Sequence, residues 1–164
     1  MKRLSLLVVA LAVVAAGCSK SSTSPSTTPT KPTFTAALST ANEVPPITNA
    51  EAGGRGDATI TIDQTALSVT FVVNLNGFPA GTPINIAHIH EAPAGTNGSV
   101  RVATTLAAGQ VTLTNGSGSF TSVATGQDAA LLQAIINNPA GYYFNAHSTL
   151  NPGGVVRGQL VRVQ

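Results

Sequence analysis

Residues 58–75, ATITIDQTALSVTFVVNL, decide the fold of this chain. Apolar and polar side chains alternate on both sides of a short polar segment, Asp63-Gln64-Thr65. The expected inward side chains are Ala58, Ile60 and Ile62 before the turn and Leu67, Val69, Phe71, Val73 and Leu75 after it. Alternation with a period of two is typical of strands that bury one face. The stretch therefore predicts a β-hairpin.

The rest of the chain contains seven further strand candidates, most of them separated by clusters of Gly, Pro and Asn. They are residues 34–39, 84–90, 99–104, 110–114, 118–123, 141–147 and 155–163. One segment has helical spacing instead, because Leu131, Leu132, Ile135 and Ile136 form an apolar stripe. Thr125 and Asp128 fit a helix-capping pattern before it. We expect an all-β protein, an antiparallel, Greek-key-like β-sandwich with one short helical crossover near residues 126–138.

The N-terminus carries an export pattern. Lys2 and Arg3 precede an uncharged run over residues 4–16, and Ala-Ala-Gly-Cys follows at 15–18. A basic start, a short apolar run and small residues are typical of a secretory signal peptide, and the run is too short for a spanning helix. Ala-Ala-Gly-Cys at 15–18 resembles a bacterial lipobox. That resemblance implies cleavage after residue 17, acylation of Cys18 and attachment to the lipid bilayer.

A tether connects this anchor to the folded domain. Residues 18–33 begin with Cys18 and continue with Ser, Thr, Pro and Lys, a composition that predicts disorder. We assign residues 34–164 to one domain. In many bacteria with two membranes, an Asp directly after the acylated Cys resembles a signal that retains the protein in the inner membrane. Ser19 stands at this position here, which favours the outer membrane if the organism has one. The expected location is the cell envelope, outside the cytoplasm.

Charge gives no reason to expect a nucleic-acid partner. The net charge of the full chain is +2, from eight basic and six acidic residues. Loss of residues 1–17 removes Lys2 and Arg3, which leaves six of each sign. A neutral domain lacks the basic surface that nucleic acids require. A single Cys also excludes a disulfide framework.

Four segments in order resemble the CHRD domain, the module named after its repeats in chordin. They are FTAALSTANEVPP at 34–46, AHIHEAPAG at 87–95, YYFNAHS at 142–148 after the helix, and NPGGVVRGQL at 151–160. The resemblance implies a β-rich extracytoplasmic module and assigns no reaction to it. We therefore expect a binding or structural module, with a protein or a polysaccharide as partner and no catalytic residues.

The three histidines are the candidate metal ligands. His88 and His90 alternate on one expected strand, so both side chains leave the same face, and His147 ends another. Three imidazoles suit copper or zinc better than magnesium or calcium. Two alternatives stay open: an acid–base role, or polar strand residues bonded to backbone, Glu43, Glu91 or Asn145.

A weaker resemblance connects this pattern with copper/zinc superoxide dismutase, another β-sandwich. It rests on HIHE at 88–91 before a Gly-rich loop and on the stretch 151–157. It implies a copper-dependent oxidoreductase in which His88, His90 and His147 hold copper and Arg157 guides an anion. The chain lacks the fourth, bridging His, a His-rich zinc loop and a Cys pair.

Glu43 and Arg157 are the expected supporting polar residues. Glu43 lies in the segment Asn42-Glu43-Val44-Pro45-Pro46. This segment is either a rigid exit from the first strand, fixed by its two prolines, or it holds Glu43 in place as a partner of Arg157 or of one of the histidines. Arg157 follows the turn Asn151-Pro152-Gly153-Gly154. It is either an exposed strand cation or a partner for an anion or carboxylate.

Overall fold

The structure is a computed structural model that describes residues 31–164. The expected signal peptide, Cys18 and nearly all of the tether lie outside these residues. The strands are β1 (Thr33–Ser39), β2 (Arg55–Asp63), β3 (Ser68–Asn76), β4 (Thr82–Glu91), β5 (Ser99–Ala103), β6 (Val111–Leu113), β7 (Gly118–Ala124), β8 (Tyr142–Ser148), β9 (Val156–Gln159) and β10 (Val161–Arg162). The helix is α1 (Ala129–Asn137), and short 3-10 turns are η1 (Thr40–Asn42), η2 (Thr114–Gly116) and η3 (Pro139–Gly141).

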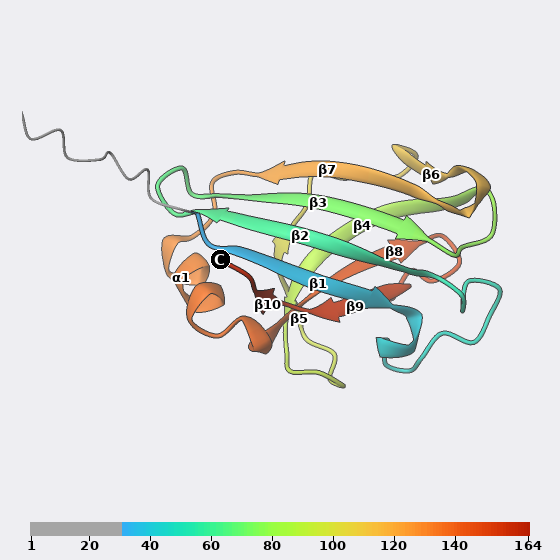
Figure 1. Ribbon diagram of the computed structural model, residues 1–164, viewed down its shortest axis with the longest axis horizontal. Coiled ribbons are helices and arrows are strands. Elements are labelled where there is room, and N and C mark those ends of the chain that lie inside the picture. Colours follow the sequence, from blue (N-terminus) through green and yellow to red (C-terminus); the bar gives the residue numbers. More distant parts are fainter. Residues whose placement is uncertain (1–30) are drawn as a thin grey trace, which may run out of the picture.

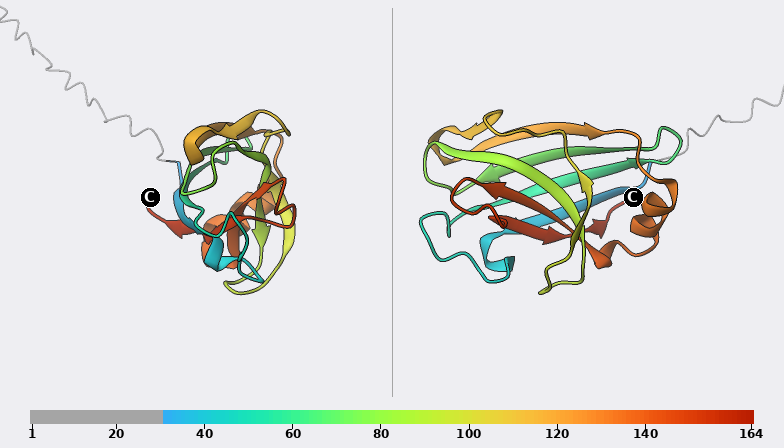
Figure 2. Two further views of the ribbon diagram at one scale, coloured as in Figure 1. Left: turned by 90° about the vertical axis from the view of Figure 1, so that its right-hand side faces the viewer. Right: turned by 180° about the vertical axis from the view of Figure 1, so that it is seen from behind.

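All strand pairs are antiparallel, and they follow the order β5-β4-β8-β9-β1-β2-β3-β7. This sheet curls round one interior until its ends nearly meet (Figures 1 and 2). At the seam, β6 pairs with the start of β4, and Ser122 of β7 accepts a hydrogen bond from the Thr105 backbone at 2.8 Å. The prediction of an all-β antiparallel fold with one short helix is confirmed.

The predicted hairpin is the first half of the core. β2 and β3 pair over their full lengths, from Arg55 with Asn76 to Asp63 with Ser68. Their inward side chains are almost completely buried, and Phe71 of β3 reaches across the interior to Phe144 of β8, with ring centroids 5.8 Å apart. Leu67 is an exception: it is 36% exposed and lies in the turn with φ +50°, so its expected inward position is wrong.

The helix begins later than the capping pattern predicts. Its N-cap is Asp128, whose carboxylate accepts a hydrogen bond from the Leu131 N–H at 2.8 Å, and not Thr125. Gly126 has φ +68° and the Gln127 N–H bonds to Leu67 O, so the chain is still outside the helix there. Within residues 31–164, no helix is long and apolar enough to cross a membrane.

A second, polar layer covers the outer face of β4, β8 and β9. Every residue of β8 is buried, although a strand with one solvent face would alternate. Tyr142, Phe144 and Ala146 belong to the apolar core, while the intervening Tyr143, Asn145 and His147 are buried on the other side. The loops around residues 40–54, 92–98 and 149–154 pack over this side. The candidate site lies in this layer.

Candidate metal centre

The pairing of β4 with β8 brings the three histidines together. Ile86 pairs with His147, His88 with Asn145 and His90 with Tyr143, so all three imidazoles project from the same face of neighbouring strands. His88 Nδ1 lies 3.2 Å from His147 Nε2. One ring nitrogen from each of the three residues lies within 4.8 Å of the others. With metal–nitrogen bonds near 2 Å, this spacing fits one shared ion after small side-chain rotations.

Backbone carbonyls orient two of the rings. His90 Nδ1 lies 3.0 Å from Gly98 O, and His147 Nδ1 lies 3.0 Å from Pro152 O. A carbonyl oxygen only accepts, so in each ring Nδ1 carries the proton and donates it. Both rings therefore present an unprotonated Nε2, and His90 Nε2 is buried without a hydrogen-bond partner. Histidine ligands of metals are typically oriented by this kind of outer hydrogen bond.

The third ring, His88, is the accessible one. It is half-buried, whereas His90 and His147 are buried. Because His147 Nε2 is unprotonated, His88 Nδ1 donates the hydrogen bond between them. A metal ion at Nδ1 would require this proton to move to the other nitrogen of the His88 ring. Because His88 is the most exposed of the three rings, a metal ion would reach the centre from the side of His88.

The surroundings keep the imidazoles neutral. Burial lowers the pKa of His88 from 6.5 to about 4, and repulsion by His147 and His90 adds to the effect. Burial also lowers the pKa of His90 and of His147, against the opposing effect of their carbonyl partners. Neutral imidazole is the form that binds metal, so protons compete weakly with a metal ion near neutral pH.

Tyr143 and Arg157 support the ring of His90 from one side. Tyr143 stacks on His90 with centroids 4.9 Å apart and an interplanar angle of 6°. Its hydroxyl accepts a hydrogen bond from the Gly98 N–H at 3.2 Å, next to the carbonyl that holds His90. The guanidinium carbon of Arg157 lies 4.8 Å from the Tyr143 ring centroid. The cation, the phenol and the imidazole thus form one packed column.

Arg157 is enclosed, so its interpretation as an exposed strand cation is wrong. It is 3% exposed; its Nε donates to Asn42 O, and its Nη1 donates to Thr96 O and to Asn97 Oδ1. Glu43 is 5% exposed, with Oε2 4.0 Å from Arg157 Nε. Of the open interpretations of Glu43, partnership with Arg157 is the one observed. Burial raises the pKa of Glu43 to about 7, although the charge of Arg157 opposes this.

The lowered pKa values of the histidines and the raised pKa of Glu43 predict how the stability of the domain depends on pH. Below pH 6.5 the unfolded chain binds more protons at its histidines than the folded domain, so stability falls as the pH falls toward the folded pKa of His88 near 4. Between pH 4.5 and 7 the folded domain binds more protons at Glu43, so that residue lowers stability as the pH rises.

Replacing Glu43 by Gln should therefore make the free energy of unfolding increase more steeply with pH between 4.5 and 7. Urea unfolding at four pH values across this range measures the slope. Parallel curves for the variant and the wild type would show that Glu43 titrates alike in the folded and unfolded states. Asp57→Asn is the control, because Asp57 is an exposed carboxylate on β2, away from this layer.

The sequence predicted the three histidines as candidate metal ligands but did not predict the groups that orient their rings. Hydrogen bonds from the histidines to the backbone were one of the open alternatives, and His90 and His147 make them, but neither Tyr143 nor the particular carbonyls of Gly98 and Pro152 were expected. Tyr143 had a signal in the sequence, since Tyr143, Asn145 and His147 form a polar face opposite the apolar Tyr142, Phe144 and Ala146. The carbonyls had none, because every residue carries one.

A family model described as the CHRD domain matches residues 34–160, most of the chain. Among curated proteins, none matches.

Proposed function

The chain belongs to the CHRD domain family, and from this premise and the geometry of the site we propose that it is an extracytoplasmic binding module that holds one copper or zinc ion at His88, His90 and His147. The observation that carries the proposal is the convergence of the three ring nitrogens within 4.8 Å. The fixed tautomers of His90 and His147 support it, because they aim unprotonated nitrogens at the same place.

The chemistry of the three ligands narrows the choice of metal ion. Imidazole suits zinc and copper, whereas magnesium and calcium take oxygen ligands. Three protein ligands leave a fourth position open, the arrangement of zinc sites that receive a further small ligand. Calorimetric titration of the purified protein with zinc and with copper tests the proposal: one ion per chain is expected for each. Absence of a heat signal with both metals would contradict it.

The second candidate, a copper-dependent oxidoreductase acting on superoxide, is favoured by the same convergence. Its weak point is Arg157, whose guanidinium is buried against Asn42, Thr96 and Asn97, while an anion guide needs donors that the anion can reach. A superoxide dismutation assay of the copper-loaded protein separates the candidates. Turnover above that of the same amount of free copper would favour the oxidoreductase.

We further propose that acylated Cys18 anchors the module to the bilayer of a bacterial cell envelope, on the outer membrane where the cell has one. Several acyl chains on one residue make attachment stable, where one chain gives marginal binding. Unknown protein or polysaccharide ligands would then be bound at the membrane surface.

Replacing Cys18 by Ser should release the protein from membranes, because the thiol is the acylation site. Expression in a bacterium, labelling with a clickable fatty acid and membrane fractionation measure the effect. Ser22→Ala is the control, since it leaves the lipobox intact. A Cys18→Ser protein that stays in the membrane fraction would contradict the anchor.

A further inference from the structure

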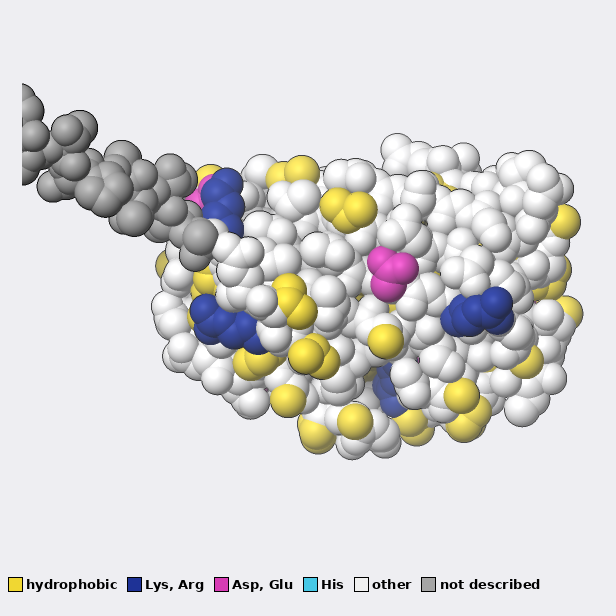
Figure 3. All heavy atoms as spheres, in the orientation of Figure 1, with side chains coloured by type: hydrophobic (Ala, Val, Ile, Leu, Met, Phe, Trp, Pro, Cys, Tyr) yellow, Lys and Arg dark blue, Asp and Glu magenta, His cyan; other side chains and the backbone are white. Residues whose placement is uncertain are grey.

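The domain contains a second buried carboxylate besides Glu43. The face formed by β1, β2 and β3 carries its charged side chains on the surface and shows no histidine (Figure 3). Glu51, in contrast, is 3% exposed and lies in the loop between η1 and β2. Among the described residues it forms no salt bridge. Burial of a carboxylate is costly unless it is hydrogen-bonded, so the partners of Glu51 indicate what it stabilises.

Glu51 holds the turn that follows β8 at two points. Its Oε2 accepts a hydrogen bond from the Ser148 hydroxyl and another from the Asn151 side-chain amide, both at 2.5 Å. The Asn151 N–H in turn donates to Ser148 Oγ at 3.0 Å. These partners lie 97 and 100 positions away from Glu51 in the chain. Glu51 therefore fixes the turn over residues 148–154 relative to a loop from the other end of the domain sequence.

The same turn carries the carbonyl that orients His147. Asn151 O accepts a hydrogen bond from the Gly154 N–H at 3.1 Å, which closes a β-turn with Pro152 at its second position. The His147 Nδ1–H donates to Pro152 O at 3.0 Å. Pro152 directly follows Asn151, the residue whose side chain Glu51 binds. The position of this carbonyl thus depends on the bonds at the base of the turn.

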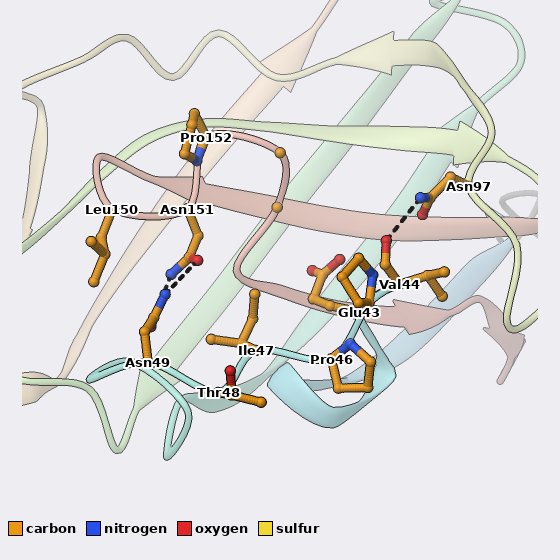
Figure 4. A pocket seen from close by; sticks show the side chains of 13 residues that line it. Glu43, Val44, Pro46, Ile47, Thr48, Asn49, Asn97, Leu150, Asn151 and Pro152 are labelled. Carbon is orange, nitrogen blue, oxygen red and sulfur yellow. Dashed lines mark hydrogen bonds between the residues drawn. The ribbon is translucent and has the colours of Figure 1, made fainter.

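Packing contributes little to the position of the tip of this turn. Pro152 and Gly153 are exposed, and a cleft of about 420 Å³ lies between the turn and residues 43–49 (Figure 4). In Figure 4, Asn49 and Asn151 bridge one end of the cleft through their side-chain amides. Because side-chain packing is sparse here, hydrogen bonds hold the turn in place.

We propose that Glu51 is a positioning residue of the metal centre, because it holds the turn whose carbonyl orients His147. The inference rests on the proposed metal function. With Pro152 O displaced, the Nδ1–H form of His147 loses its acceptor, and the bond between His147 and His88 fits either direction. A proton on His147 Nε2 would then block the nitrogen that the metal needs. Loss of such outer partners costs about 10- to 100-fold in metal affinity.

Nitrogen NMR of the metal-free, isotope-labelled full chain in detergent shows which ring nitrogen carries the proton. In the wild type, His90 and His147 should both carry it on Nδ1. Replacing Glu51 by Ala should give His147 a mixture of both tautomers. It should leave His90 unchanged, because Gly98 O holds that ring independently of the turn. Zinc affinity, measured by calorimetry, should fall about 10-fold, the lower end of the range for lost outer partners.

Three further variants separate positioning from stability. Glu51→Gln should recover most of the affinity and the Nδ1–H form of His147, because both bonds end on one oxygen and an amide oxygen accepts them. Ser122→Ala is the matched control: Ser122 is also buried and polar, but it bonds to the Thr105 backbone at the seam. Asn151→Ala changes a partly buried residue and removes one of the two bonds, so it decides the matter if Glu51→Ala fails to fold.

Three results would overturn the inference. The first is an unchanged Nδ1–H signal of His147 in every folded variant that lacks a bond to Glu51. The second is an equal change in Ser122→Ala, which would trace the effect to lost stability. The third is wild-type zinc affinity in a variant whose His147 signal shifts. A wild type that binds no zinc would contradict the proposed function instead, and the metal-free ring signals would decide separately whether Glu51 orients His147.

Discussion

Replacing His147 by Ala is expected to reduce zinc affinity at least 100-fold, more than the 10- to 100-fold loss that follows when only the outer partner of a ligand is removed. His147 supplies one of three nitrogens, and Pro152 O fixes its ring. The remaining pair, His88 and His90, lies on one strand and offers two ligands, too few for a stable zinc site in this geometry.

His147 is buried, so its removal also leaves a cavity. His88→Ala separates the two effects, because His88 is half-buried and is the most accessible of the three. It should reduce affinity by a similar factor with a smaller loss of stability. Glu91→Gln is the matched control: Glu91 follows His90 on β4, but its carboxylate pairs with Arg101 at 2.9 Å. Calorimetry gives the affinity, and unchanged binding in both histidine variants would exclude this site.

Replacing Arg157 by Met should cost about 3–5 kcal/mol of unfolding free energy, the range for breaking a buried ion pair by removing one partner. The change removes three hydrogen bonds to Asn42, Thr96 and Asn97 and takes away the counter-charge of the buried Glu43, which must then either stay unpaired or take up a proton. Those bonds fix the loop that ends in Gly98, whose carbonyl orients His90. Metal affinity should therefore fall as well.

The exposed pair of Arg101 with Glu91 provides the comparison. Both side chains are more than 40% exposed, so Arg101→Met should change stability by at most about 1 kcal/mol. The double variant Glu43→Gln with Arg157→Met should recover part of the loss, since no charge then remains unpaired. Urea unfolding measures all four proteins. A loss below about 1 kcal/mol for Arg157→Met would show that the pair contributes no more than a surface contact.

Period-two alternation predicted the strands well because most of them bury one face. It was least informative for β8, which is buried on both faces by a layer of loops that no local pattern reveals. The helix was placed correctly by the spacing of Leu131, Leu132, Ile135 and Ile136, while its start was wrong because Gly126 delays it.

The candidate site was predictable only in part. The placement of His88 and His90 on one face follows from their spacing on a strand. The arrival of His147 depends on the pairing of β4 with β8, strands separated by about 50 residues, and on an irregular register between Ile84 and Ile86. Glu43 and Arg157 were recognised as candidate partners, but their burial depends on loops that cover the sheet.

Nitrogen NMR of the histidine rings during zinc titration tests the central claim most directly, because it reports which ring nitrogen each metal bond uses. The geometry predicts that one equivalent of zinc shifts Nδ1 of His88 and Nε2 of both His90 and His147 to metal-bound values. Nδ1 of His90 and of His147 should stay protonated on their carbonyls. If the three rings keep their metal-free signals at excess zinc, the account of a three-histidine metal centre is wrong.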